Sequence, residues 1–199
     1  YPVCFSEDAK KLYIVSGFNT QALKTMECYD VAANSWSMMP SELPIERYSV
    51  ATCVLQNSMY MMGGTDGNST LQDVRRYGME DGVWSTMTNM RVARYGHSAI
   101  VLGDFIYALG GCNVDDDVLS TVERYDAPSN TWADAAPMRT ARAFFAACVL
   151  NGCIYVMRGC DINFNKLSSA ERYDPATNTW SEIASMSTSR RVDGAVLGG

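Results

Sequence analysis

Four tryptophans at a constant interval constrain the fold of this chain more than any other feature. They stand 48 residues apart, and a tyrosine lies seven residues before each of them. Self-similarity with a period of this size is the signature of a protein built from repeated supersecondary units. The sequence therefore predicts four successive units of one kind. The tryptophans are Trp36, Trp84, Trp132 and Trp180, and the tyrosines are Tyr29, Tyr77, Tyr125 and Tyr173.

Three further markers keep the same phase, which makes a chance origin of the period untenable. A second tyrosine, a residue pair that ends in glycine and an arginine each recur at steps of 47 or 48 residues. The tyrosines are Tyr13, Tyr60, Tyr107 and Tyr155; the pairs are Ser16-Gly17, Gly63-Gly64, Gly110-Gly111 and Arg158-Gly159; the arginines are Arg47, Arg94, Arg142 and Arg190.

The segments between the markers have the pattern of short β-strands. Stretches such as 59–62 and 153–157 are apolar, contain aromatic or β-branched residues and end at one of the glycine-containing pairs. Stretches such as 121–126 alternate roughly between polar and apolar residues, and the Asp-x-x-x-Asn-x-Trp run at 126–132 is typical of a tight turn. No segment has a sustained helical period, so each unit is predicted to be four antiparallel strands, with the periodic tyrosines and tryptophans in the core.

Four short strands bury their faces poorly alone, whereas radial stacking of such sheets buries both faces. The glycine pairs fit this arrangement because glycine within a strand is typical of a close approach by neighbouring groups. We therefore expect a β-propeller with blades of about 48 residues. The predicted boundaries are 1–46, 47–93, 94–141 and 142–189 for four blades, and 190–199 for the first strand of a further blade or a closing strand.

The succession of an aromatic strand, Gly-Gly, Tyr-Asp and Trp resembles the kelch repeat, and the unit from Ile106 to Trp132 is nearest to it. The arginine-flanked segments look most like those of kelch-like adaptors, in which a propeller follows BTB and BACK domains. The resemblance implies an all-β kelch β-propeller of four four-stranded antiparallel blades plus one extra strand, as part of a six-blade propeller. A closed four-blade ring and closure through a second copy remain the alternatives. Arg158 stands where the family has glycine, which predicts a distorted fourth blade or an arginine that extends to an opening.

Composition limits the classes of partner. The net charge is −6, which disfavours binding to nucleic acid through its phosphates. No apolar run approaches the ~18 residues of a membrane span, so no membrane partner is expected. The seven cysteines form no C-x-x-C pair and predict reduced thiols in a cytoplasmic protein, with cytoskeletal or nuclear location as alternatives. Because the chain begins with Tyr1 and no signal peptide follows, we expect a piece of a longer protein.

Kelch-like adaptors bind partner peptides on a face built from two sets of loops. The resemblance implies that one set contributes each arginine with the residue after it, and that the other set follows the glycine pair. Converging arginines would grip the carboxylates of an acidic peptide of a substrate protein, and aromatic neighbours would add contact area. The implied contacts are Arg47, Tyr48, Arg94, Tyr95, Arg142 and Arg190 in the first set, and Phe18, Asn19, Thr65, Asp66, Asn113 and Asp161 in the second.

The repeated arginines and the acidic run 115–117 can each be interpreted in two ways. The arginines recur in every unit, so they are equally expected as scaffold residues that hydrogen-bond loop carbonyls between blades. The acidic run 115–117 is first a solvated loop and second an electrostatic selector for a basic region of a partner.

The predicted function is a non-catalytic protein-interaction module, the substrate-recognition propeller of a cullin-RING E3 ubiquitin ligase adaptor. Cullin would bind through domains absent from this chain. An actin-binding cytoskeletal kelch protein is the alternative, and a sugar mutarotase-like kelch enzyme comes third. His97 is the only histidine and is expected to be an inner-strand residue, and neither a nucleophile elbow nor a P-loop occurs. We therefore predict no catalytic residue, no metal site and no cofactor.

Overall fold

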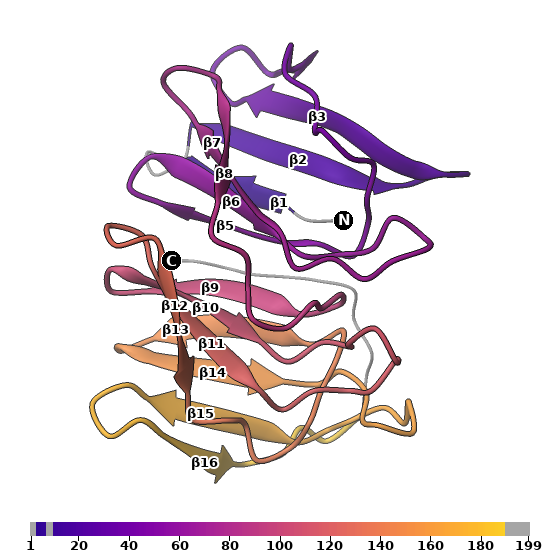
Figure 1. Cartoon of the computed structure of the whole chain (residues 1–199). Helices are drawn as coiled ribbons and strands as arrows, with labels where there is room; N and C mark the ends of the chain where they lie inside the picture. The colour runs from indigo at the N-terminus through magenta and orange to yellow at the C-terminus, as the bar shows by residue number, and fades with distance from the viewer. Residues whose placement is uncertain (1–2, 7–9, 190–199) are drawn as a thin grey trace. The chain divides into compact units, whose positions relative to one another are not determined.

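The computed structural model describes residues 3–6 and 10–189. Within these residues the chain forms sixteen β-strands and no helix, arranged as four four-stranded sheets. The chain divides into two compact units, Tyr1–Tyr95 and Gly96–Gly199, with two sheets in each (Figure 1). Among the described residues there is no helix of the length and apolarity that a membrane span requires.

All four sheets are antiparallel meanders in which each strand pairs with its neighbour in sequence. The first unit contains β1 (Val3–Phe5), β2 (Lys11–Phe18), β3 (Ala22–Asp30) and β4 (Ser35–Met38) in one sheet, and β5 (Ala51–Leu55), β6 (Ser58–Met62), β7 (Val74–Gly78) and β8 (Trp84–Met87) in the other. The second unit contains β9 (Ser98–Leu102), β10 (Phe105–Leu109), β11 (Val122–Asp126) and β12 (Thr131–Ala135), then β13 (Ala146–Leu150), β14 (Cys153–Met157), β15 (Ala170–Asp174) and β16 (Thr179–Ile183).

The periodic tyrosine, asparagine and tryptophan form one local structure at the outer hairpin of a sheet. In the last sheet, Tyr173 pairs with Trp180 across β15 and β16, and their ring centroids lie 5.1 Å apart. The hydroxyl of Tyr173 donates to Oδ1 of Asn178 at 2.8 Å, and Asn178 adopts the left-handed conformation (φ +52°) that a tight turn requires. The same tyrosine–asparagine bond recurs as Tyr29 to Asn34 and Tyr125 to Asn130.

In the second unit, Trp180 of the last sheet packs against the sheet before it. The indole Nε1 of Trp180 donates to the carbonyl of Ala136 at 2.8 Å, while the N–H of Ala136 donates to Asn178 at 2.9 Å. Trp180 is buried there with residues of β10, β11 and β14. Trp36 is about half exposed, so its prediction as a core residue is wrong. The reason is that no sheet precedes the first one in the described part of the chain.

Arg158 replaces a glycine without disturbing its sheet. Its φ of +70° is close to the +55° of Gly110 at the equivalent position, so the arginine adopts the left-handed conformation that glycine has elsewhere. The pairing of β14 with β15 continues in register up to Met157, the residue before it. The predicted distortion of the fourth blade is therefore wrong.

Two glycine substitutions separate backbone strain from close packing. Gly103 and Gly110 have similar left-handed φ values, +60° and +55°. An added Cβ at Gly103 would meet nothing within 4 Å, whereas at Gly110 it would lie 2.5 Å from the Arg142 carbonyl oxygen. Gly103→Ala should lower the free energy of unfolding by about 1 kcal/mol, and Gly110→Ala by about 1–3 kcal/mol more. Urea denaturation measures both, and equal losses would contradict the packing described for Gly110.

Candidate functional site

Two of the arginines that open a repeat, Arg47 and Arg142, each connect the two sheets of their own unit. In the first unit, the N–H of Arg47 donates to the Leu23 carbonyl at 3.1 Å, and its own carbonyl accepts from Gly17 at 3.3 Å. These bonds tie its backbone to the first sheet. The guanidinium reaches the second sheet, where it donates to the two carboxylate oxygens of Asp73 at 2.5 and 2.9 Å and to the Gly63 carbonyl at 3.3 Å.

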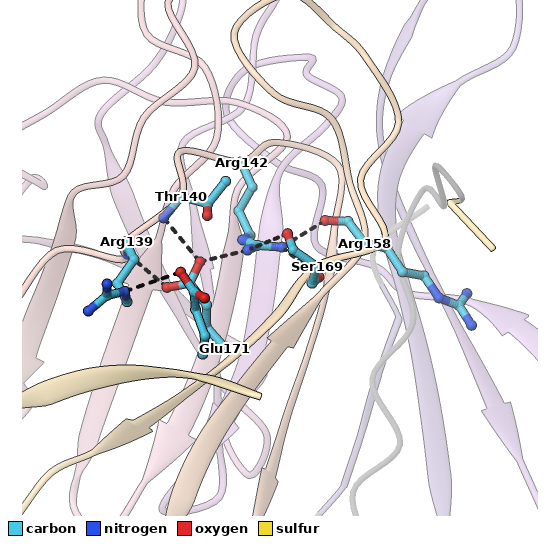
Figure 2. Close-up of polar contacts among 7 residues, drawn as sticks. Arg139, Thr140, Arg142, Arg158, Ser169 and Glu171 are labelled. Atoms are coloured by element: carbon cyan, nitrogen blue, oxygen red, sulfur yellow. Dashed lines mark hydrogen bonds and ion pairs between the residues drawn. The ribbon is translucent and has the colours of Figure 1, made fainter. Parts of the chain in front are cut away.

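Arg142 repeats this arrangement in the second unit. Its N–H donates to the Leu119 carbonyl at 3.1 Å, and its carbonyl accepts from Gly111 at 2.9 Å, both in the third sheet. Its guanidinium donates to the carbonyls of Arg158 at 3.0 Å and Ser169 at 3.3 Å in the fourth sheet. Figure 2 shows that Arg158 offers only its backbone here, because its own guanidinium extends away from the cluster.

Glu171 on β15 completes the cluster around Arg142. Its Oε1 accepts from Nη2 of Arg142 at 2.7 Å, and both side chains are fully buried. The same carboxylate accepts the backbone N–H groups of Arg139 at 2.7 Å and Thr140 at 3.0 Å (Figure 2). A buried ion pair is best tolerated when its remaining polar atoms are also hydrogen-bonded. These backbone bonds satisfy the Glu171 carboxylate, whereas Nε of Arg142 is buried without a hydrogen-bond partner.

The surroundings of Asp73 favour its ionised form. Burial by itself raises the pKa of Asp73, but the hydrogen bonds and positive charges of Arg47 and Arg75 outweigh it, and the net pKa lies below the ordinary 3.8. The carboxylate is therefore ionised at neutral pH and its charge is committed to two arginines of the protein.

The three described arginines of the predicted site are not exposed. The side chains of Arg47, Arg94 and Arg142 have 0% exposure. Arg94 makes the same backbone bonds as the other two, donating to Leu71 at 3.0 Å and accepting from Gly64 at 2.9 Å. This geometry favours the scaffold interpretation and does not form the expected basic rim. Arg190 lies outside the described residues.

Four other predicted contacts turn their side-chain oxygens into their own loops. Asn19, Asp66, Asn113 and Asp161 each accept backbone N–H bonds from residues one to four positions further on. Such bonds hold a tight loop in one shape, and they lower the pKa of Asp66 and Asp161 below the ordinary 3.8. The donors are Thr20 and Gln21, Asn68 and Ser69, Asp115 and Asp117, and Asn163 and Asn165, respectively.

The residues that these loops present to solvent are different ones. Val114 is 68% exposed, Ile162 60% and Phe164 48%. Val114 and Ile162 each follow a turn-forming residue directly and stand 48 residues apart, so they occupy one position of the repeat. None of the three was predicted from the sequence, although that position in the period was a signal that could have found them.

The first unit brings together several predicted aromatic and loop residues. The rings of Phe18 and Tyr48 lie 5.1 Å apart, and Phe18 is about half exposed. The backbones of Tyr48 and Thr65 exchange two hydrogen bonds of 2.9 and 3.0 Å. Asp66 belongs to an open hollow whose other lining residues are Lys24, Pro44, Ile45, Glu46 and Asn68. Tyr95 is partly exposed at the end of this unit.

The cysteines and the histidine are part of the fold. All seven cysteines are free thiols and only Cys148 is not buried. Burial raises the pKa of the Cys4 thiol to about 12, so the reactive thiolate is disfavoured at neutral pH. His97 is buried, as expected, but it lies immediately before β9 and not within a strand. Within the described residues no three side chains of His, Cys, Asp or Glu gather as metal ligands.

Removing a buried guanidinium should cost far more than removing an exposed one. Arg142→Met leaves the Glu171 carboxylate buried without its cation, which should lower the free energy of unfolding by about 3–5 kcal/mol. Arg139→Met is the control, because its pair with Glu182 is solvent-exposed at 3.4 Å and should be worth about 0.5 kcal/mol. Urea denaturation distinguishes them, and a loss under 1 kcal/mol for Arg142→Met would contradict a scaffold role.

Asp73 should contribute to acid sensitivity. Because its pKa is lower in the folded state, its stabilising contribution is present at neutral pH and is lost as the pH falls below about 4 through the folded pKa. Asp73→Asn should lower the free energy of unfolding at pH 7. It should also make the decrease of this free energy between pH 4 and 2 less steep, by up to ~1.4 kcal/mol per pH unit. Urea midpoints across this range test it. An unchanged slope would show that Asp73 is not held ionised by the arginines.

Comparisons with known proteins agree with this architecture. Residues 3–195 match the family model described as the KLHDC2/KLHL20/DRC7 Kelch-repeats domain. Kelch-like protein 23 of Homo sapiens is 34% identical over 103 residues, which cover 50% of this chain and 18% of that protein. Kelch repeat and BTB domain-containing protein 2 of Cowpox virus (strain Brighton Red) is 25% identical over 125 residues, which cover 53% of this chain and 22% of that protein. The chain thus spans about a fifth of the length of these curated relatives.

The solved structures lead to the same fold. The structure of YjhT superposes with a TM-score of 0.81 over 96% of this chain and 67% of that one, at 17% identity. This likeness shows the fold, and together with the four antiparallel sheets it confirms the predicted all-β kelch propeller. The family match and the relatives confirm the resemblance to BTB-kelch proteins. The chain belongs to the kelch-repeat family.

Proposed function

We propose that this chain is a protein-interaction module, the substrate-recognition propeller of a cullin-RING ubiquitin ligase adaptor. The similarity to Kelch-like protein 23 and to a kelch repeat and BTB domain-containing protein supports this assignment. The cullin would bind through parts of the full polypeptide outside this chain. The propeller would supply specificity and raise the effective concentration of the substrate near the ligase.

The observation that carries the proposal is the pair of ordered loops in the second unit that expose apolar side chains. Val114 and Ile162 would be sheltered if they served only the fold, yet they are more than half exposed. Backbone hydrogen bonds to Asn113 and Asp161 hold the loops that present them. A preformed loop loses little conformational entropy on binding, and conformationally defined loops on a rigid scaffold are where binding residues gather.

The role is recognition, and transfer of ubiquitin belongs to the ligase. The carboxylates of Asp73 and Glu171 are committed to buried arginines, so we assign them to the scaffold. Partners are proteins, with neither nucleic acid nor membrane among them. We also propose a cytoplasmic location, which suits seven free thiols.

Affinity purification of the full polypeptide that carries this segment tests the proposal. We expect a cullin scaffold in near-stoichiometric amount together with candidate substrates. A Val114→Ser/Ile162→Ser variant should lose the substrates and keep the cullin, because the two bind different regions. Val31→Ser is the matched control, since Val31 is an exposed valine (55%) in the turn between β3 and β4.

Two results would contradict the proposal. Recovery of actin without cullin would make the protein a cytoskeletal binder. Recovery of the same substrates with the Val114→Ser/Ile162→Ser variant would move the binding surface away from these loops.

A further inference from the structure

We infer that the two loops at 112–118 and 160–166, together termed the loop surface, take a partner segment that combines Lys or Arg with a large apolar side chain. The inference rests on the proposed function, because it names the class of segment that the same loops would bind. It goes against the acidic peptide expected from the sequence.

The two loops lie side by side in the second unit. The backbone of Arg142 bonds to Leu119 and Gly111, which flank the first loop. The next residue, Ala143, exchanges two hydrogen bonds of 2.9 and 3.1 Å with Cys160, which opens the second loop. The loops therefore stand on either side of residues 142–143, and both follow their strands, β10 and β14, at the right-hand end of these sheets in Figure 1.

The loop surface is apolar at its most exposed points. Val114 and Ile162 stand at equivalent positions of the two loops, and Phe164 follows in the second. Phe164 has a φ of +57°, which is unfavourable for a bulky residue, and its N–H donates to the Asp161 carbonyl at 2.9 Å. These three side chains are 48–68% exposed on two neighbouring ordered loops, so each offers apolar area to a partner.

The charge around this apolar area is negative. Asp115, Asp116 and Asp117 are exposed, and hydrogen bonds from the N–H groups of Asn165 and Asn163 keep the pKa of the partly exposed Asp161 below its usual range. Residues 112–118 and 160–166 thus contain four carboxylates and a single ammonium group, that of Lys166.

Arg142 does not offset this charge, and the partly exposed Arg158, two residues before the second loop, adds only one cation beside it. Arg142 lies beneath the loops with 0% exposure, and its charge is taken by Glu171. A segment rich in Asp or Glu would therefore be repelled, whereas a segment with Lys or Arg beside a Leu or Phe would match the surface in both charge and apolarity.

The test is a selection of phage-displayed random 12-residue peptides on the chain at 50 mM salt. The wild type is compared with Asp115→Asn/Asp116→Asn/Asp117→Asn, which removes three charges and keeps side-chain size. The matched control neutralises three exposed carboxylates outside the loop surface, Asp104→Asn/Asp134→Asn/Glu182→Gln. Val114→Ser/Ile162→Ser removes the two exposed aliphatic side chains of the loop surface. Urea denaturation verifies that every variant is folded.

We expect the wild type and the control to enrich peptides with net positive charge and a large apolar residue. The best of these peptides, synthesised with a fluorophore, should bind the triple aspartate variant about tenfold more weakly at 50 mM salt. This difference should shrink at 500 mM salt because the charges are exposed and screened. Val114→Ser/Ile162→Ser should weaken binding at both salt concentrations.

The peptide selection distinguishes failure of this inference from failure of the proposed function. Peptides that need Val114 and Ile162 but are neutral or acidic would overturn the inference and leave the proposed function standing. Peptides that bind every variant equally, or no enrichment on the chain at all, would overturn both.

Discussion

Each unit depends on an arginine that joins its two sheets and whose guanidinium is withdrawn from water. Arg47 and Arg142 attach by their backbone to the loops of one sheet and by their side chain to the next. Arginine suits this position because its planar fork can serve a carboxylate and backbone carbonyls together while staying charged. The chain crosses from sheet to sheet at the same end where the loops gather, so this interaction holds the loop bases in place.

That arrangement divides the loops into a buried base and an exposed tip. Buried backbone groups need partners, and the arginine, its acidic partner and the glycine after each inner strand provide them at the base. At the tip, turn-forming side chains such as Asn113 and Asp161 hold the loop from within. The side chains of Val114, Ile162 and Phe164 take part in neither task, and our proposal assigns recognition to them.

The repeat could be predicted from sequence because its parts interact within one period. The tyrosine, asparagine and tryptophan of an outer hairpin lie within seven residues of one another, so their spacing encodes the turn and the strand pairing directly. The strands and the antiparallel order follow from short apolar segments between turns. Trp36 departs from its prediction because burial of this side chain depends on a neighbouring sheet, which the local pattern does not contain.

The role of the arginines could not be predicted in the same way. Their acidic partners do not keep the period: Asp73 lies 26 residues after Arg47, whereas Glu171 lies 29 residues after Arg142. One partner is an aspartate and the other a glutamate, on strands that the arginine reaches only in the folded chain. The 29-residue spacing recurs between Arg94 and Glu123, but Asp73 departs from it. A recurring arginine whose acidic partner changes along the chain is compatible with both a ligand contact and a scaffold bond, and the three-dimensional structure favours the second.

A double-mutant cycle between Arg142 and Glu171 tests the scaffold role of the buried arginine most directly. The free energy of unfolding would be measured for Arg142→Met, Glu171→Leu and the double variant by urea denaturation. The double variant should be more stable than the sum of the single losses predicts, with a coupling of about 2 kcal/mol or more, because each single change strands a buried charge. Losses that add within about 0.5 kcal/mol would show that the two groups do not depend on each other. The buried arginine would then not be the interaction on which the sheets depend.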